Sequence, residues 1–547
     1  MPGTSGTSSR ISSGTSSGTS SGSSSGISRR SLFAGSAAGT AAALLSAGTA
    51  AAAPKHRPKA EGAAKSAVSG ASYRAAYHFT VPDQWKNDPQ RPVWIDGEYR
   101  YYYLYNADYF TGAVGTAWRL ATTTDLVSFT DRGVAAPKDT TSNGDLWSGS
   151  AVVDTGNTAG FGAGAVVVIV TMSPGDGADQ QAQFLYYSTD GGLTFTNYGT
   201  APVLPNPGVA DFRDPKVIRD EDRGRWVMAL AENDKIGFYH SDDLKSWTYV
   251  GGFVHDGIGV LECPDLFRIT AGDGTVKWVL GASANGKASG LPNTYAYWTG
   301  SFDGSAFTAD TSDPQWLDHG WDWYAAVTFE KRNASGAVDA AARYAIGWVN
   351  NWDYANTTPT IDCDGFNGTD SVVREITLKK ASDNSYYLAS QPVAGLDSHV
   401  SRTVNLGDVT VDGTKVLDYT GISYEVTTEI TWSQLTGAGL QLRRSPDGGR
   451  HIDAGIYADY AFLNRRGTVN ADTSGKWQES HTPFAPSAGT VKLRILVDRT
   501  SVEMFVDDGR YVHTSQVFPY VLDTRLALFT IGGSAVFRNT VIREFSV

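Results

Sequence analysis

The stretch Thr124-Asp125-Leu126-Val127-Ser128-Phe129 decides the fold, because its pattern recurs along the chain. A turn that opens with Asp and ends in an aromatic residue returns at 190–195, 243–247 and 303–307, and the opening aspartates are 65, 53 and 60 residues apart. Self-similarity at this period, in sequence made of short strand-like runs, is typical of β-propeller blades. The four copies and the tail from Trp316 to Val393 together predict five blades. The alternative is a set of unrelated hairpins that share turn chemistry.

Beyond Leu396 the character of the sequence changes. Apolar and polar residues alternate in the runs 409–411, 424–430, 491–497 and 501–506. This alternation is typical of antiparallel sheets with one solvated face. We therefore expect an all-β chain, with a five-bladed β-propeller over residues 72–396 followed by a C-terminal β-sandwich over residues 403–547.

The N-terminal region predicts an export signal and not a folded domain. Residues 1–27 are almost entirely Ser, Gly and Thr, which is low-complexity sequence. Arg29-Arg30 then precedes an apolar run of small residues that ends near Ala53, as in a twin-arginine signal peptide. A membrane anchor fits less well, because the run is mostly Ala and Gly. We expect a leader over 1–53, a flexible linker over 54–71, and a secreted protein.

Composition narrows the class of ligand. The formal net charge is −12 without a basic stripe, which argues against nucleic acid as a partner. Beyond the leader, no segment is long and apolar enough to cross a membrane. No metal-binding spacing stands out, and we expect no cofactor. Aromatic residues reach 12%, with 15 Trp, which fits both a β-core and stacking on sugar rings.

Three acidic motifs carry the candidate chemistry. Asp88, Asp214 and Glu262 each stand in a short motif with Pro, in text that otherwise predicts strand and turn. Since the innermost strands of a propeller line one central funnel, these distant residues can converge there. A glycosidase needs two carboxyl groups in different protonation states. We expect Asp88 to be the ionised nucleophile, held charged by Asn87 and backbone donors, and Glu262 to be the protonated acid/base. Asp214, kept ionised by Arg213, would bind sugar hydroxyls and stabilise the transition state.

Two cysteines, Cys263 and Cys363, lie near these motifs. Two cysteines do not make a disulfide framework. A single bridge between them is one interpretation, and two buried thiols is the interpretation that we favour.

The chain resembles glycoside hydrolase family 32, the fructan hydrolases and invertases, from about Tyr77 to the C-terminus. The matching segments are Trp85-Lys86-Asn87-Asp88-Pro89, Trp147-Ser148-Gly149-Ser150, Phe212-Arg213-Asp214-Pro215, Glu262-Cys263, 318–326, 348–352 and 497–505. The resemblance implies a retaining mechanism with a covalent fructosyl–Asp88 intermediate and carboxyl groups about 5–5.5 Å apart. It also implies a fructan substrate and favours β-2,6-linked levan. The residues that we expect to bind it are Asn87, Trp147, Ser148, Arg213, Trp352, Trp323 and Gln90, with Trp321 and Trp323 alternatively packing in the core.

Two departures from the family pattern leave the exact reaction open. The nucleophile motif continues Gln90-Arg91-Pro92 where the family usually has Asn-Gly, and Leu104 replaces the usual Gln. Both changes resemble the bacterial levan-active branch, which includes levan fructotransferases that form a difructose dianhydride. The presence of Asn87 favours a hydrolase. An exo-inulinase or broad β-fructosidase also fits these motifs, and a non-catalytic fructan-binding protein fits them less well. A sialidase-like propeller would need an arginine cluster that the sequence does not reveal. Oligomeric state is not indicated.

Overall fold

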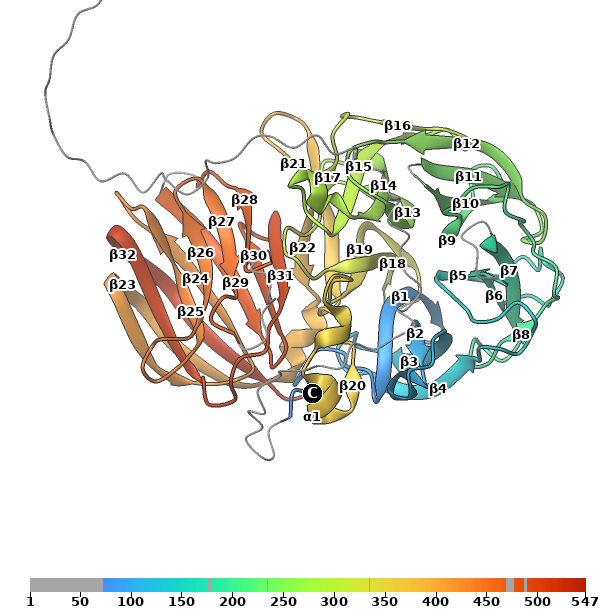
Figure 1. Cartoon of the computed structure of the whole chain (residues 1–547). Helices are drawn as coiled ribbons and strands as arrows, with labels where there is room; N and C mark the ends of the chain where they lie inside the picture. Colours follow the sequence, from blue (N-terminus) through green and yellow to red (C-terminus); the bar gives the residue numbers. More distant parts are fainter. Residues whose placement is uncertain (1–71, 175–179, 234, 334, 469–476, 487–488) are drawn as a thin grey trace, which may run out of the picture. The chain divides into compact units, whose positions relative to one another are not determined.

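The structure, a computed structural model, describes residues 72–174, 180–233, 235–333, 335–468, 477–486 and 489–547. The predicted leader over 1–53 and linker over 54–71 lie outside the described residues, so twin-arginine export stays a prediction. Figure 1 shows the described chain as five small sheets around a common centre, coloured blue to yellow, followed by an orange and red sandwich. The predicted all-β fold, a five-bladed propeller with a C-terminal sandwich, is confirmed.

The propeller blades are antiparallel sheets of four or five strands. Blade I comprises β1 (Gln84–Ile95), β2 (Glu98–Asn106), β3 (Ala117–Thr123) and β4 (Thr130–Ala136), and blade II comprises β5 (Gly149–Asp154), β6 (Ala165–Met172), β7 (Ala182–Ser188) and β8 (Thr196–Asn197). Blade III comprises β9 (Arg213–Asp220), β10 (Arg225–Glu232), β11 (Lys235–Ser241) and β12 (Thr248–Val254). Blade IV comprises β13 (Leu261–Thr270), β14 (Val276–Ala284), β15 (Tyr295–Phe302), β16 (Phe307–Ala309) and β17 (Gln315–Trp316), and blade V comprises β18 (Tyr324–Arg332), β19 (Val338–Trp348), β21 (Arg374–Lys380) and β22 (Tyr386–Pro392).

The described helical segments are short connections between strands. They are η1 (Tyr109–Thr111), η3 (Gly286–Ser289), η4 (Ala355–Thr357), α1 (Thr360–Asp364) and η5 (Ala394–His399). Among the described residues, no helix has the length and apolar character needed to cross a bilayer.

The recurrent Asp turn joins the third and fourth strands of a blade. In blade I the Oδ1 atom of Asp125 accepts hydrogen bonds from the backbone N–H groups of Val127 and Ser128, at 2.9 and 2.8 Å. Asp243 and Asp303 accept in the same way, whereas Asp190 accepts from N–H groups three and four residues ahead. Blade V has a copy too, where Asp383 accepts from the N–H of Ser385 at 2.9 Å. The repeat is therefore an Asx turn that carries the chain to the outer strand. The copy at Asp383 was not recognised in the sequence, because it lies 80 residues after the previous copy and the others are 53 to 65 residues apart.

A strand from the end of the propeller closes the ring of blades. The short strand β20 (Phe366–Asn367) follows α1 and pairs in parallel with the start of β1, where Phe366 lies opposite Gln84. The inner strands β1, β5, β9, β13 and β18 contact one another in sequence, and β18 contacts β1 again. Separate apolar clusters fill the spaces between neighbouring blades. Neighbouring blades are therefore held together by burial of the apolar side chains between them, and not by hydrogen bonds between strands of every pair of blades.

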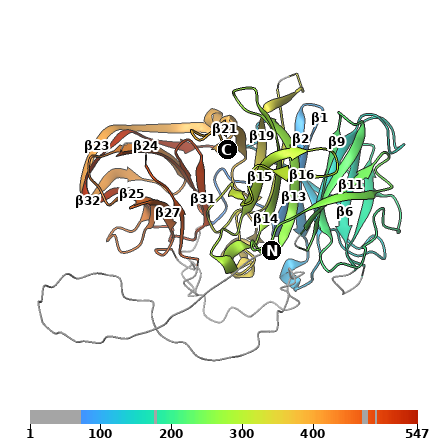
Figure 2. The same cartoon turned by 90° about the horizontal axis from the view of Figure 1, so that it is seen from above.

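The sandwich is built on two long bent strands. They are β23 (Val400–Thr420) and β32 (Arg525–Phe545), and several register shifts interrupt their pairing. One half of β32 pairs with β25 and the other with β24, so the two faces share it. The remaining strands are β24 (Tyr424–Thr431), β25 (Gly437–Arg444), β26 (Ile452–Tyr457), β27 (Tyr460–Asn464), β28 (Glu479–Pro483), β29 (Thr490–Val497), β30 (Ser501–Val506) and β31 (Tyr511–Gln516). Figure 2 shows the two faces of this unit edge-on.

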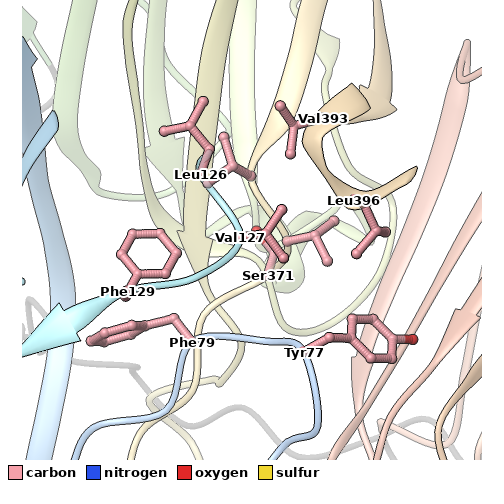
Figure 3. Close-up of a pocket in the computed structure, with 10 residues that line it drawn as sticks. Tyr77, Phe79, Leu126, Val127, Phe129, Ser371, Val393 and Leu396 are labelled. Carbon is pink, nitrogen blue, oxygen red and sulfur yellow. The ribbon is translucent and has the colours of Figure 1, made fainter. Parts of the chain in front are cut away.

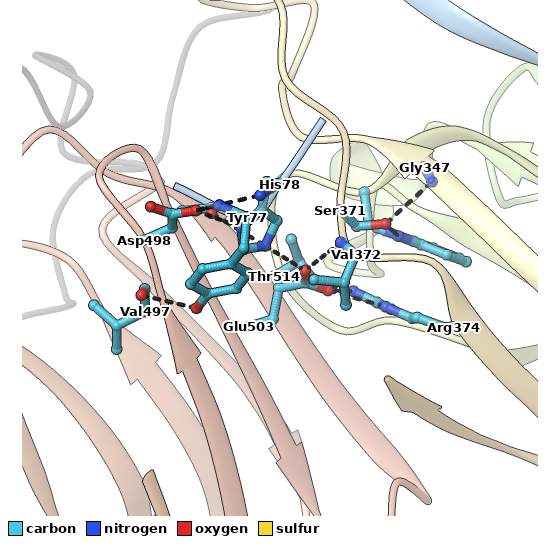
Figure 4. A network of polar contacts seen from close by, with 12 residues as sticks. Tyr77, His78, Gly347, Ser371, Val372, Arg374, Val497, Asp498, Glu503 and Thr514 are labelled. Atoms are coloured by element: carbon cyan, nitrogen blue, oxygen red, sulfur yellow. Dashed lines mark hydrogen bonds and ion pairs between the residues drawn. The ribbon is translucent and has the colours of Figure 1, made fainter. Parts of the chain in front are cut away.

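A buried network of charged side chains joins the sandwich to the propeller (Figure 4). His78, just before β1, contacts Asp498 and Glu503 of the sandwich, each at 2.9 Å. Arg374 of β21 forms ion pairs with Glu503 and with Asp318, the latter at 2.9 Å. These side chains are fully buried, so an unpaired charge here would be costly. The network therefore specifies how the two units pack.

A small apolar pocket lies between blade I, blade V and η5 (Figure 3). Only Tyr77 and Ser371 among its lining residues carry a side-chain hydroxyl. The Tyr77 hydroxyl already donates to the carbonyl of Val497 at 2.8 Å, and that of Ser371 accepts from the indole N–H of Trp323 at 2.9 Å. Sugar hydroxyls would find no free polar partner among these lining groups, so this pocket is a packing feature and not a sugar site.

Candidate active site

The three predicted carboxylates stand on inner strands of the propeller. Asp88 lies on β1, Asp214 on β9 and Glu262 on β13. In each of these strands the pairing with the next strand shows a register shift close to the carboxylate. Such β-bulges bend a strand and redirect its side chains. The bulges therefore explain how residues far apart in sequence reach one centre.

Backbone strain marks the same positions. Asp214 has φ 64° and Cys263 has φ 48°, although both are followed by proline and neither is glycine. The equivalent position of β18 is Ala325, with φ 49°. Left-handed conformations of this kind cost about 1–3 kcal/mol each and persist only where surrounding contacts hold them. The chain bears this cost on three inner strands, at Asp214 and next to Glu262 and Tyr324.

Asp88 is held by two side-chain donors. The amide of Asn87 donates to Oδ1 of Asp88 at 2.9 Å, and the Ser148 hydroxyl donates to Oδ2 at 2.6 Å. Burial nevertheless raises the pKa of Asp88, and the charge of Glu262 adds to this, while the two hydrogen bonds and Lys86 oppose it. Asn87 was expected as a donor, but the second donor is a hydroxyl and not a backbone N–H.

The carboxyl group of Glu262 accepts hydrogen bonds from two side chains. Arg213 donates from Nη2 to Oε1 of Glu262 at 3.0 Å, and the Tyr324 hydroxyl donates to Oε2. The same guanidinium also pairs with Asp211. Tyr324 was not among the predicted site residues, although it lies within the 318–326 segment, where an isolated tyrosine carries no signal of its own. The carboxyl group of Glu262 is thus oriented from both sides.

Asp214 differs from the expectation in its electrostatics. Its Oδ2 atom accepts a hydrogen bond from the backbone N–H of Cys263 at 3.0 Å, whereas Arg213 approaches only to 3.9 Å. Burial raises the pKa of Asp214 to about 7; the charges of Glu262 and Asp88 act in the same direction, and Arg213 opposes them. Arg213 lowers the pKa of Asp214 in the predicted direction, but burial outweighs it, and the guanidinium lies closer to Glu262 and Asp211.

A single sulfur atom lies between two of the carboxylates. Cys263 Sγ is 3.9 Å from Oδ2 of Asp88 and 3.8 Å from Oδ2 of Asp214. Burial, followed by these two negative charges, raises the pKa of the Cys263 thiol well above its usual range. Both cysteines are free, so the bridge considered as an alternative is absent and the favoured interpretation of two thiols holds. Cys263 is buried as expected, but Cys363 is exposed on α1, which corrects the expectation of two buried thiols.

Aromatic rings form one wall beside the carboxylates. The indole of Trp85 stacks on Tyr109 and on Trp352, with centroids 4.9 and 6.2 Å apart. Trp352 and Tyr109 are partly exposed and pack on the same cluster as Cys263. Trp147 is also partly exposed, next to Ser148. Partly exposed rings beside carboxylates offer flat apolar faces to a sugar.

Two residues that were predicted to bind substrate have buried side chains. Trp323 is fully buried, and its indole N–H donates to Ser371. Gln90 is 1% exposed, and its carboxamide binds the Ser148 hydroxyl at 3.1 Å and the Gly149 N–H at 2.8 Å. As substrate contacts these two residues are corrected: Trp323 fills the core, and Gln90 supports Ser148 from behind. Trp321 packs edge-on against Trp477 of the sandwich.

Among the residues that the structure describes, no group of three or more His, Cys, Asp or Glu side chains is arranged to hold a metal ion. The side chains that meet at this site supply carboxyl groups, one phenol, one guanidinium, one thiol and hydroxyl donors.

Family models match both halves of the described chain. The model of the glycosyl hydrolases family 32 N-terminal domain matches residues 78–392, and that of the family 32 C-terminal domain matches residues 394–544. The chain belongs to glycosyl hydrolase family 32. It is a glycoside hydrolase, and the resemblance seen in the sequence is confirmed.

Individual relatives within family 32 agree with this assignment. A levanbiose-producing levanase of Bacillus subtilis is 53% identical over 475 residues, which cover 86% of this chain and 91% of that protein. A levanbiose-producing levanase of Geobacillus stearothermophilus is 53% identical over 399 residues, 73% of this chain and all of that protein. The crystal structure of an exo-inulinase from Aspergillus awamori superimposes with a TM-score of 0.77 at 27% identity, covering 87% of this chain and 99% of that one.

The two departures from the usual family 32 pattern lie beneath the site surface. Gln90 supports Ser148, as described above. Leu104 is 4% exposed and belongs to the apolar cluster between blades I and II, together with Tyr102 and Trp118. Both departures therefore lie in the interior, Gln90 behind Ser148 and Leu104 between blades I and II.

Proposed function

We propose that this family 32 enzyme hydrolyses β-2,6-linked levan with retention of configuration and releases a short fructo-oligosaccharide, most simply a disaccharide. The two relatives at 53% identity are named levanbiose-producing levanases, whereas the exo-inulinase structure is 27% identical. The observation that carries the proposal is the meeting of Asp88 and Asp214 at Cys263, the residue next to Glu262.

Asp88 is the proposed nucleophile. An Oδ atom would attack the anomeric C2 of a fructosyl unit, forming the fructosyl–Asp88 ester as the glycosidic C2–O bond breaks. The hydrogen bonds from Asn87 and Ser148 support the ionised carboxylate in the free enzyme. They would also hold the attacking oxygen in a fixed direction, which shortens the search for a reactive geometry.

Glu262 is the proposed acid/base. In the first step its carboxyl proton would pass to the departing glycosidic oxygen. In the second step the resulting carboxylate would take a proton from water, which attacks C2 and frees Asp88. The donors Arg213 and Tyr324 orient this carboxyl group, and they would stabilise its charged form between the two steps.

Asp214 and the aromatic wall are proposed to bind sugar. Asp214 would accept hydrogen bonds from ring hydroxyls, which favour its ionised form when substrate is bound. Trp147 and Trp352 would pack on the apolar faces of successive fructosyl units. Partly exposed side chains at both positions support this assignment.

The product profile on levan tests the reaction, with inulin as a parallel substrate. A reducing disaccharide from levan, with slower release from inulin, supports the proposal. Fructose alone from both substrates would indicate a broad exo-acting fructosidase. A non-reducing dianhydride would mean that a second sugar hydroxyl replaces water, as in a fructotransferase.

Asp88→Asn tests the role of the nucleophile. The amide cannot form the ester, so turnover should fall by several orders of magnitude while circular dichroism and melting stay close to those of the parent protein. Asp154→Asn is the matched control, because Asp154 is also fully buried on an inner strand but binds only the turn at Thr158 and Ala159. Near-normal turnover by Asp88→Asn would overturn the assignment.

A further inference from the structure

Directly behind the carboxylates lies a guanidinium that the proposed chemistry does not use. Arg91 follows Asp88 by three residues on β1 and is 2% exposed. Its Nη1 atom donates to the carbonyl of Gly149 at 2.6 Å and to that of Pro215 at 3.3 Å, and Nη2 donates to the carbonyl of Pro264. One side chain therefore binds three backbone carbonyls from three other blades.

The three carbonyl groups that Arg91 binds belong to residues next to the site. Gly149 follows Ser148, Pro215 follows Asp214, and Pro264 follows Cys263. Each carbonyl thus belongs to the residue immediately after one that contacts a site carboxylate or carries one. Through Arg91, strand β1 is tied to β5, β9 and β13 at the level of the site. A planar guanidinium presents several donors in a fixed fork, so it fixes the relative positions of its acceptors.

The strain described above makes such a tie necessary. Asp214 and Cys263 keep left-handed backbone conformations, with φ 64° and 48°, immediately before two of the residues whose carbonyls Arg91 binds. Strained backbone relaxes unless surrounding contacts over-determine it. If the tie at Pro264 were lost, relaxation of Cys263 would move the neighbouring Glu262, and relaxation at Pro215 would move Asp214.

A second interpretation is that Arg91 only fills the channel. Lys216 and Asp265 form an ion pair of 3.1 Å deeper in the funnel, and Arg343 stacks on Phe267 nearby. These groups already place two further cations around one carboxylate. Another buried positive charge is a poor choice for filling space, because its desolvation is expensive. The three carbonyl contacts explain why arginine stands here and a neutral side chain does not.

We propose that Arg91 is a positioning residue that sets the separation of Asp88 from Asp214 and Glu262, by holding the backbone of β5, β9 and β13 against β1. The proposal rests on the proposed function, since it assumes that these carboxylates do the chemistry. Arg91 itself touches no substrate. It acts through the strands, so its loss should slow the chemical steps and leave sugar binding by the aromatic wall in place.

The test compares Arg91→Lys and Arg91→Met with the parent enzyme on levan. Misplacement by about 1 Å costs about 10²-fold in rate, so we expect Arg91→Met to lower kcat by about that factor with KM nearly unchanged. Arg91→Lys keeps the charge but cannot bridge three carbonyls, and we expect an intermediate loss of about tenfold. The conservative variant keeps the test informative if Arg91→Met fails to fold.

Arg443→Met and Arg443→Lys are matched controls. Arg443 is 3% exposed in the sandwich and also binds three backbone carbonyls, those of Asp523, Ile422 and Tyr520. Its variants should lower the melting temperature without changing kcat at temperatures where the protein is folded. Equal kcat in the Arg91 and Arg443 variants, or a loss expressed only in KM, would overturn the proposal. An active Asp88→Asn would instead overturn the proposed function, so the two failures are distinguishable.

Discussion

The Ser148 hydroxyl donates a 2.6 Å hydrogen bond to Oδ2 of Asp88, from the start of blade II to the first strand of blade I. Ser148 is itself fixed by the Gln90 carboxamide at 3.1 Å. Burial raises the pKa of Asp88, and the hydroxyl is the strongest of the contacts that oppose this rise. The bond therefore keeps a buried carboxylate available in its ionised form.

Ser148→Ala should move the acid limb of the kcat/KM profile to higher pH. The hydrogen bond from Ser148 favours the charged form of Asp88, so its loss should raise the pKa of Asp88 further. The nucleophile would then be protonated over a wider acidic range. The measurement is kcat/KM for levan across the acidic and neutral range, in which the free enzyme's ionisations appear.

Ser150→Ala is the control for the serine exchange. Ser150 lies two residues further on, in β5, and is 1% exposed, but its hydroxyl accepts a hydrogen bond from the N–H of Val217 and meets no carboxylate. Its acid limb should coincide with that of the parent enzyme. An acid limb unmoved by Ser148→Ala would show that Ser148 does not set the ionisation of the nucleophile.

Asp214→Asn should stabilise the fold while abolishing efficient turnover. Burial raises the folded-state pKa of Asp214 to about 7, above its unfolded value, so ionisation costs stability as the pH rises from about 4 to about 7. The amide removes this cost, and Asn tolerates the left-handed backbone at this position. We expect a higher melting temperature near pH 7.5 and little change near pH 4, measured by calorimetry of both proteins.

Asp265→Asn provides a control of opposite sign. Asp265 is also fully buried, but Lys216, followed by Arg91 and Arg343, outweighs that burial and holds its pKa below the usual range. Its contribution to stability is therefore present above the unfolded pKa, so the variant should melt lower near neutral pH. If both variants shifted the melting temperature in the same direction, the electrostatic account of Asp214 would be wrong.

Thiol titration should count one reactive cysteine in the native protein and two after denaturation. Cys363 is exposed on α1, whereas Cys263 is buried and burial raises the pKa of its thiol. Since the thiolate is the reactive species, Cys263 should be slow to react. Labelling of native protein with iodoacetamide should modify Cys363 alone and leave turnover unchanged, as peptide mass analysis would check. Rapid labelling of Cys263 would contradict the buried placement.

Sequence periodicity was sufficient for the fold because the Asx turns are local. Asp125 and its counterparts bind N–H groups two to four residues ahead, so each short segment carries the whole pattern. The carboxylates Asp88, Asp214 and Glu262 were predictable for the same reason, since each stands in a short motif. Tyr324 was missed because its importance comes from a partner 62 residues away.

The errors share one physical origin, which is the direction of a side chain. Trp323 and Gln90 lie beside site residues in sequence, yet both side chains are buried: Gln90 lies between two register shifts of β1, and Trp323 comes just before β18. The interplay of burial and charge at Asp214 is also invisible in sequence, because it depends on where the Arg213 guanidinium points. Sequence motifs indicate which strands reach the site, and only the geometry tells which side chains face it.

His78→Gln should destabilise the protein most at mildly acidic pH, because His78 joins the two units through Asp498 and Glu503. Burial alone would lower the pKa of His78, but the two carboxylates raise it to about 9. A folded-state pKa above the unfolded value gives stability that is complete below about pH 6.5 and is lost as the pH rises through about 9. We therefore expect the free energy of unfolding to fall by about 3 kcal/mol near pH 6 and by less near pH 9.5. Denaturant unfolding at both pH values measures this difference.

His399→Gln is the control. Its free energy of unfolding should change little at either pH, since His399 pairs with Asp125 at 2.8 Å in a partly exposed place. A loss for His78→Gln that does not change between the two pH values would mean that the imidazole acts by shape and not by charge.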